Sequence, residues 1–208
     1  MSRCVIIGGA EIKDYNRIKT LLKADDFFIF CDCGLRHREG LCVKPSLIVG
    51  DFDSTENPKE DIETIVLPRE KDDTDTVFAA REGIRRGFEE FLILGGVGGR
   101  FDHTMGNVSL LLFLKEAGKK ATLCDDYSDM EIVSKEGNEI TDDYKFFSIV
   151  SLSDKVEGVT VTDAKYPLQN AVITSSFPIG ISNEVIKGKT AKVIASEGNL
   201  LLIKVHKE

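Results

Sequence analysis

The chain has 208 residues, of which 42% are hydrophobic and 30% charged, values close to those of ordinary globular domains. Twenty-seven Lys and Arg against 35 Asp and Glu give a formal charge of −8, which argues against nucleic acid as a partner, because phosphates require a basic face. The longest apolar runs, Phe27–Cys31 among them, fall far short of the roughly 20 residues that cross a membrane. We therefore expect a soluble globular protein with no membrane partner.

The cysteines and the amino-terminal segment indicate a cytoplasmic protein. Five cysteines stand at irregular spacing without a C-x-x-C pair, as expected of thiols in a reducing compartment. The segment that begins at Met1 reaches Gly8 too soon to hold the apolar core of a signal peptide. A metal site built from Cys31, Cys33, His37 and Cys42 is the alternative interpretation of this part of the chain.

The first part of the chain alternates short apolar runs with helical patterns, which is typical of βαβ units and a parallel sheet. The runs predict strands over residues 4–8, 27–31, 47–49, 64–67, 91–94 and 121–124. The helical spacing of apolar residues predicts helices over residues 14–23, 74–86 and 102–116, the last ended by Gly118. We expect an α/β domain with a mostly parallel sheet over residues 1–126.

The remaining residues, 127–208, lack helical periodicity. Short β-branched runs predict strands over residues 130–133, 146–152, 159–162, 171–174, 191–195 and 200–205. Gly, Asn, Asp and Pro separate these runs at the spacing of turns, and Ser196–Asn199 looks like a hairpin turn between the last two strands. This half therefore predicts a C-terminal antiparallel β-sandwich or a barrel.

Acidic residues follow two predicted strands of the first domain, where ligands of open α/β sheets bind. Asp32 follows residues 27–31 directly, and Asp51 and Asp53 follow residues 47–49. In an extended segment residues i and i+2 point to the same side, so Asp51 and Asp53 should converge on a cation such as Mg²⁺. The alternative is a solvated acidic turn in which Ser54 caps a helix.

Two further loops carry chemistry. Lys71–Asp75 precedes a predicted helix with more acid than capping requires, although Asp and Thr there could be no more than N-caps. Gly95–Gly99 joins a strand to a helix, and its four glycines allow close approach of a phosphate, for which Arg100 supplies a planar cation. The spacing matches neither the dinucleotide fingerprint nor a Walker A loop, and Asp102 could equally cap its own helix.

The order of these segments resembles the thiamin pyrophosphokinase (thiamin diphosphokinase) family. The residues that carry the resemblance are Asp32, Pro45–Ser54, Lys71–Asp75 and Gly95–His103, with Ile181–Glu184 similar to the Ser-Asn signature of that family. The resemblance spans nearly the whole chain. It implies an α/β nucleotide-binding catalytic domain, a β-sandwich domain for thiamin binding and dimerisation, and a homodimer with active sites at the subunit interface.

The resemblance also implies a reaction and its residues. A diphosphate passes from ATP to the thiamin hydroxyl, giving thiamin diphosphate and AMP, with Mg²⁺ as the cofactor. Metal ligands are expected at Asp51, Asp53 and Asp75, and the catalytic set adds Asp102. ATP contacts are expected from Asp32, Lys71, Asp72, Thr74, Arg100 and Asp102, and thiamin contacts from Asp75, Ser182, Asn183 and Tyr166.

Several alternatives remain open from the residues. Either Asp75 or Asp102 could accept the hydroxyl proton. The chain has no Trp, so Tyr166 or Phe177 would hold the thiamin rings, and both could equally be sandwich core. A family Asp-Gly-Gly-Ala segment is here Asp32-Cys33-Gly34-Leu35. A Mg²⁺-dependent nucleotide phosphohydrolase and a non-catalytic nucleotide sensor are the competing functions.

Overall fold

The computed structural model describes residues 2–52, 61–68, 70 and 73–206. The chain divides into two compact units, Met1–Asp126 and Tyr127–Glu208. In the described ranges no helix is long and apolar enough to cross a membrane.

The first unit is built on a parallel sheet. Its strands are β1 (Cys4–Ile7), β2 (Phe27–Cys31), β3 (Leu47–Gly50), β4 (Thr64–Val66), β5 (Glu90–Leu94) and β6 (Lys120–Cys124), in the spatial order β4-β3-β2-β1-β5-β6. All five pairings between neighbours are parallel. The central strands are continuous apolar runs because helices cover both of their faces. The predicted mostly parallel α/β sheet is confirmed.

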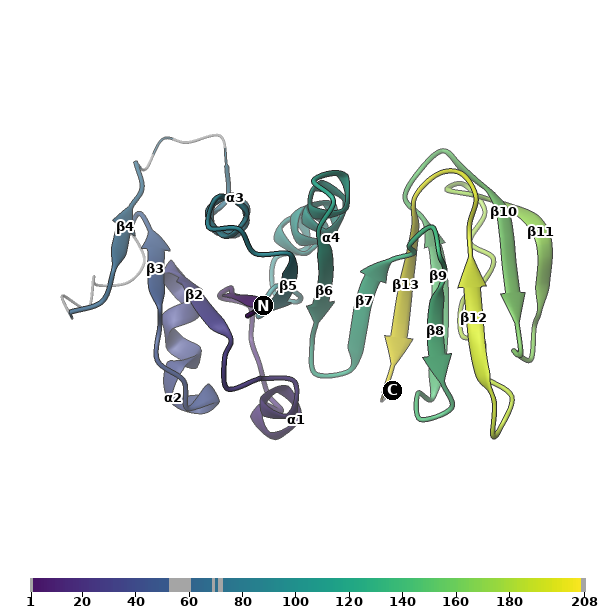
Figure 1. The fold of residues 1–208 in the computed structure, drawn as a ribbon, viewed down its shortest axis with the longest axis horizontal. Coiled ribbons are helices and arrows are strands. Elements are labelled where there is room, and N and C mark those ends of the chain that lie inside the picture. The colour runs from purple at the N-terminus through teal and green to yellow at the C-terminus, as the bar shows by residue number, and fades with distance from the viewer. Residues whose placement is uncertain (1, 53–60, 69, 71–72, 207–208) are drawn as a thin grey trace. The chain divides into compact units, whose positions relative to one another are not determined.

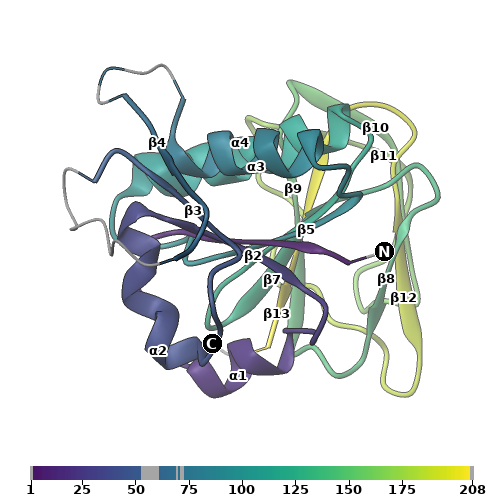
Figure 2. The same ribbon diagram turned by 60° about the vertical axis from the view of Figure 1, so that its left-hand side comes forward.

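Helices flank this sheet on two sides (Figures 1 and 2). The helices α1 (Tyr15–Thr20) and α2 (Arg38–Leu41) pack against one face, where Ile18 and Leu41 join a core with Val5 and Phe30. The helices α3 (Asp75–Arg85) and α4 (Phe101–Glu116) lie on the other face. Each helix closes a crossover between parallel strands, so its amino terminus lies at the carboxyl edge of the sheet.

Two short helical elements of the first unit were not predicted from the sequence. A 3₁₀ helix, η1 (Asp32–His37), follows β2 and leads directly into α2. Neither element has enough residues to show a helical period, so the pattern of apolar residues could not reveal them.

His37 holds this turn in place. Its Nε2 donates to the carbonyl of Ala10 at 2.9 Å, and its Nδ1 accepts from the Tyr15 hydroxyl at 2.8 Å. Since a carbonyl can only accept, the proton of the neutral ring sits on Nε2. Both ring nitrogens are therefore used within the fold, which rules out His37 as the metal ligand of the alternative cysteine site.

We expect His37 to make folding stability depend on pH. Burial lowers the pKa of His37 below its usual value, Arg36 lowers it further, and Asp126 and the Ala10 carbonyl oppose the shift. The unfolded chain then binds a proton more readily, so stability is full above about pH 6.5 and falls as pH drops below it. The melting temperature should decrease less steeply between pH 7 and 5 in His37→Gln than in the wild type. Equal slopes would contradict this account.

The second unit consists of antiparallel strands in two sheets. One sheet has the order β7 (Ser128–Ile132), β13 (Leu200–Val205), β9 (Phe146–Ser151). The other has the order β11 (Leu168–Thr174), β10 (Lys155–Thr162), β12 (Thr190–Ile194), β8 (Asn138–Thr141). Side chains of both sheets share one core, Phe147 and Leu202 from the first with Val161 and Val193 from the second. The predicted β-sandwich is confirmed.

The predicted hairpin at Ser196–Asn199 is wrong. The strands on either side of it, β12 and β13, belong to different sheets and do not pair with each other. The segment crosses from one sheet to the other, and Glu197 forms a bridge with Glu157 of β10. Short strands of similar composition give no signal for which strand each will pair with, so a turn motif alone could not identify the partner.

Candidate active site

The carboxyl edge of the parallel sheet gathers the loops that follow β1, β2, β3 and β5. Asp32 follows β2, Asp51 follows β3, and Gly8 and Gly95 follow β1 and β5. Because these strands are parallel, all four loops emerge at the same edge, where open α/β sheets bind their ligands.

Glycines allow these loops to pack closely. A Cβ at Gly8 would lie 2.6 Å from the Gly95 carbonyl oxygen, and a Cβ at Gly34 would lie 2.1 Å from that of Ile7. A Cβ at Gly50 would lie 2.7 Å from the Cβ of Asp32. The backbone at the edge is therefore assembled at distances that no larger residue permits. Sequence reasoning missed Gly8 as part of the site, although glycine directly after a strand was its signal.

Asp32 and Asp51 occupy neighbouring positions at this edge. Asp32 is 4% exposed, and it lies beside Gly50, the residue before Asp51. The extended geometry expected between Asp51 and Asp53 is wrong, because Phe52 has the left-handed φ of 53°. Asp53 itself lies outside the described residues. Among the residues that are described, no group of three or more His, Cys, Asp or Glu could hold a metal ion.

The amino terminus of α3 presents Thr74 and Asp75. Thr74 is the N-cap and its hydroxyl accepts from the backbone N–H of Val77 at 3.4 Å, while Asp75 is the first helical residue. Capping is therefore the local role of Thr74, as one interpretation of the sequence expected. Asp73, just before the cap, forms an ion pair with Arg81 at 2.7 Å. Lys71 and Asp72 lie outside the described residues.

The glycine-rich loop ends in an exposed ion pair at the start of α4. The Arg100 guanidinium donates to both carboxylate oxygens of Asp102, at 3.2 and 2.6 Å, and Asp102 also accepts from the His103 N–H at 3.0 Å. These hydrogen bonds, that from Arg100 above all, lower the pKa of Asp102 to about 2. The alternative that Asp102 caps its own helix is wrong, because Arg100 occupies the N-cap position and no side chain caps α4.

In the second unit, the candidate thiamin residues form one hydrogen-bonded segment. The Asn183 side chain is buried and accepts from the N–H groups of Tyr166 and Glu184 while donating to the Tyr166 carbonyl, at 2.8–3.0 Å. Ser182 is exposed at a left-handed φ of 56°, and its N–H donates to Ser148. Asn183 thus fixes the backbone at Tyr166 and Glu184, and Ser148 fixes that of Ser182.

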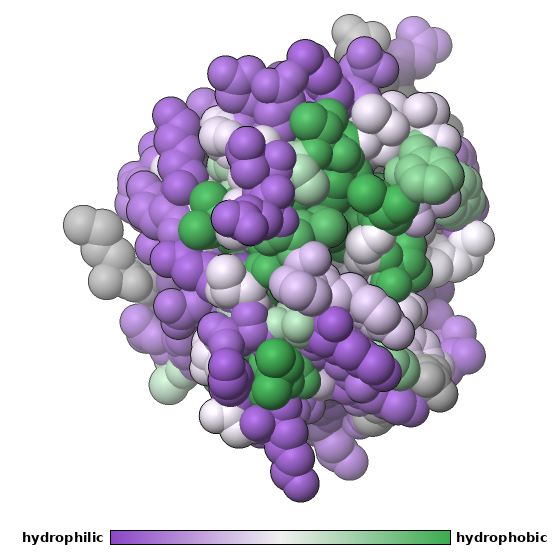
Figure 3. Space-filling model, turned by 90° about the vertical axis from the view of Figure 1, so that its right-hand side faces the viewer, coloured by the Kyte–Doolittle hydropathy of each residue, from purple (hydrophilic) through white to green (hydrophobic). Residues whose placement is uncertain are grey.

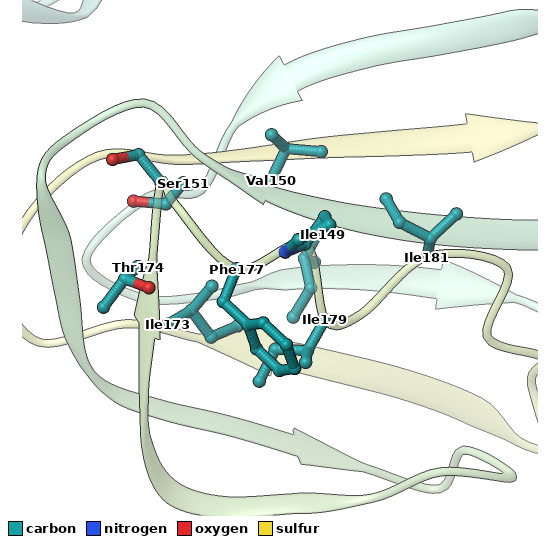
Figure 4. Close-up of a pocket in the computed structure, with 10 residues that line it drawn as sticks. Ile149, Val150, Ser151, Ile173, Thr174, Phe177, Ile179 and Ile181 are labelled. Atoms are coloured by element: carbon teal, nitrogen blue, oxygen red, sulfur yellow. The ribbon is translucent and has the colours of Figure 1, made fainter.

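Tyr166 and Phe177 are surface residues, so the alternative that they belong to the sandwich core is wrong. Their exposed fractions are 60% and 66%. Phe177 borders a cleft whose lining includes Ile149, Ile173, Ile179 and Ile181. Figure 4 shows its ring lying beside Ile173 and Ile179. Either aromatic ring is available to a ligand of the second unit.

Comparison with known proteins matches both units to one family. Residues 18–123 match the model of the thiamin pyrophosphokinase catalytic domain, and residues 130–200 match that of the thiamin pyrophosphokinase vitamin B1 binding domain. A thiamine pyrophosphokinase of Bacillus subtilis is 32% identical over 170 residues, 78% of this chain and 79% of the relative.

Solved structures agree in fold. A thiamin pyrophosphokinase from Geobacillus thermodenitrificans superimposes with a TM-score of 0.85 at 27% identity, covering 99% of this chain and 98% of that one. A Bacillus subtilis thiamine pyrophosphokinase gives a TM-score of 0.87 at 24% identity over the whole of both chains.

Proposed function

The chain belongs to the thiamin pyrophosphokinase family, and from that premise we propose how its residues divide the transfer of diphosphate from ATP to thiamin. The reaction gives thiamin diphosphate and AMP. ATP occupies the carboxyl edge of the first unit, and thiamin is bound by the second. The observation that carries this division is the close packing at one sheet edge of three glycine-containing segments, after β1, β2 and β5, and of the last residue of β3, Gly50, beside Asp32 and Asp51.

Mg²⁺ is the cofactor that the acidic residues fit. Asp51, at the end of β3, and Asp75, at the start of α3, offer carboxylate oxygens, the ligands that this hard cation prefers. These residues would hold the ion, with Asp53 as the third ligand expected from the sequence. When bound, the ion would neutralise charge on the phosphate oxygens.

The nucleotide is held by Asp32, the glycine-rich loop and Arg100, with Thr74 on the opposite side at the start of α3. Lys71 and Asp72 are the further ATP contacts expected from the sequence. The backbone of Gly95–Gly99 lets phosphates approach closely, and the first turn of α4 adds N–H groups that favour an anion. Arg100 is the planar donor for the phosphates, through the guanidinium N–H groups that its bonds to Asp102 leave available.

We expect Arg100→Ala to raise the KM for ATP by ~10-fold or more, because a charge-assisted contact to phosphate is lost. Folding stability should change little, since the Arg100–Asp102 pair is exposed. The matched control is Lys155→Ala, which removes the exposed partner of Glu157 at the same i, i+2 spacing. Steady-state kinetics with varied ATP give the KM of both variants, and their melting temperatures give the stability. An unchanged KM in Arg100→Ala would contradict the assignment.

The proton of the thiamin hydroxyl passes to Asp75 in this proposal. Asp102 is unsuited to that role, because a carboxyl group with a pKa of about 2 is a weak base at neutral pH. Asp102 instead orients Arg100 and the first turn of α4.

In this proposal thiamin is bound by the second unit, at Tyr166, Ser182 and Asn183. Tyr166 offers an exposed ring and Ser182 an exposed hydroxyl. The buried amide of Asn183 fixes the backbone of Tyr166, and the Ser148 hydroxyl accepts from the N–H of Ser182. The aromatic face suits the planar thiamin rings.

We propose a cytoplasmic homodimer with active sites at the subunit interface. Exposed apolar side chains of the second unit support this assembly, among them Val172, Phe177, Ile181 and Ile186. Figure 3 shows apolar side chains gathered on one face of the molecule. Cys4, Cys33 and Cys42 are free thiols, as the cytoplasm maintains them. Light scattering should give twice the chain mass.

The experiment that tests the function is ATP consumption with Mg²⁺, with and without thiamin. We expect consumption only when thiamin is present, because the hydroxyl of thiamin is the nucleophile. Consumption without thiamin would indicate the phosphohydrolase instead. Binding of ATP without consumption in either mixture would indicate the nucleotide sensor.

A further inference from the structure

A buried asparagine connects the two loops between which ATP is proposed to lie. Asn107, in the second turn of α4, is 6% exposed. Its Nδ2 donates to the carbonyl of Gly96 in the glycine-rich loop at 2.8 Å. Its Oδ1 accepts from the hydroxyl of Thr76, in the first turn of α3, at 2.8 Å. Both ends of one amide are thus used to join α3 to the glycine-rich loop.

The chemistry of the partners fixes the direction of every hydrogen bond. The Gly96 carbonyl can only accept, so the nitrogen of the Asn107 amide must face it and the oxygen must face Thr76. Thr76 therefore donates to Asn107 and has its oxygen left to accept. The hydroxyl of Thr74, 3.1 Å away, is then the donor to Thr76. The result is a one-way chain from Thr74 through Thr76 and Asn107 to Gly96.

A second residue on the same face of α4, Thr104, also binds the glycine-rich loop. Thr104 precedes Asn107 by three residues, a spacing that places both side chains on one face of the helix. Its hydroxyl accepts from the N–H of Gly98 at 3.0 Å. Two residues of the loop, Gly96 and Gly98, are therefore hydrogen-bonded to side chains of α4. A Cβ at Gly96 would lie 2.9 Å from Leu123 and 3.1 Å from Asn107, so the loop packs closely against both side chains at this position.

We propose that Asn107 and Thr76 are positioning residues, which set the first turn of α3, with Thr74 and Asp75, against the glycine-rich loop. This inference rests on the proposed function, in which these two elements contact opposite sides of the reacting phosphates. Neither residue needs to touch a substrate. Their effect is on rate, because misplacing reacting groups by about 1 Å can cost ~10²-fold.

The test compares Thr76→Val with Thr76→Ser. Valine keeps the shape of threonine without the hydroxyl, whereas serine keeps the hydroxyl and loses a methyl group. We expect Thr76→Val to lower kcat by ~10-fold or more, with the KM for thiamin unchanged, and Thr76→Ser to retain most of kcat. Asn107→Asp, which keeps the acceptor for Thr76 but loses the donor to Gly96, should also lower kcat.

Assays run well below the melting temperature separate positioning from a structural role. A merely structural hydrogen bond would lower the melting temperature without lowering kcat of the folded protein. Wild-type kcat in Thr76→Val, or equal losses in Thr76→Val and Thr76→Ser, would overturn the inference.

A second readout does not depend on catalysis. The backbone amide signals of Gly96 and Gly98 in an NMR spectrum should shift in Thr76→Val and stay in place in Thr76→Ser. If the wild type fails to transfer diphosphate, the proposed function fails, and the amide shifts still decide the connection between the loops. Unshifted amides in Thr76→Val would overturn it.

Discussion

Replacing Asp75 by asparagine is expected to lower the turnover of diphosphate transfer by ~10²-fold or more while the fold stays intact. Asparagine has nearly the shape of aspartate, so the start of α3 keeps its packing and its Thr74 cap. What disappears is one negative charge, which we assign to Mg²⁺ binding and proton acceptance. Turnover at saturating ATP and thiamin, with the melting temperature of each variant, measures the effect.

The matched control for Asp75→Asn is Glu39→Gln. Glu39 is an exposed acid in the first turn of α2, so its replacement also removes a negative charge from a helix amino terminus. Turnover of the control should equal that of the wild type. Near wild-type turnover in Asp75→Asn would contradict the role assigned to this carboxylate.

Replacing Gly34 by alanine is expected to destabilise the first unit by about 3 kcal/mol and to weaken ATP binding. The new methyl group would lie 2.1 Å from the carbonyl oxygen of Ile7 and 2.9 Å from its carbon. These are backbone atoms of β1, which cannot rotate away as a side chain would. Relief requires η1 to move off the end of β1, and Asp32 would move with it. Denaturant unfolding and ATP titration measure the two effects.

Gly106→Ala provides the control for this clash. Gly106 lies in α4 with no atom within 4 Å of an added Cβ, so alanine is accommodated without strain. Since alanine also favours a helix interior, stability should rise by roughly 0.5–1 kcal/mol. Equal stability of Gly34→Ala and the wild type would show that the loops do not pack as described.

The fold was predictable wherever a pattern repeats over enough residues. The strand β2 has the predicted bounds, and α3 differs from its predicted range only at the two cap residues. The elements that failed have few residues or depend on distant partners. The short helices η1 and α2 show no period, and β8 was not predicted at all. The Ser196–Asn199 error has a different cause, because strand pairing depends on contacts between segments far apart in the chain.

The site was predictable as a set of loops, because strand ends can be located from sequence. Asp32, Asp51, Asp75 and Arg100 all lie where a strand or helix begins or ends at the carboxyl edge. The supporting contacts were not predictable. Nothing in the sequence connects Asn107 to Thr76 and Gly96, since their hydrogen bonds join separate elements.

Phosphorus NMR of the protein with ATP, Mg²⁺ and thiamin tests the central claim most directly. The account predicts that AMP and thiamin diphosphate appear together, in equal amounts, and that neither appears when thiamin is omitted. ADP with thiamin monophosphate would mean attack on the γ-phosphorus instead of the β-phosphorus. That result, or phosphate released without thiamin, would contradict the account.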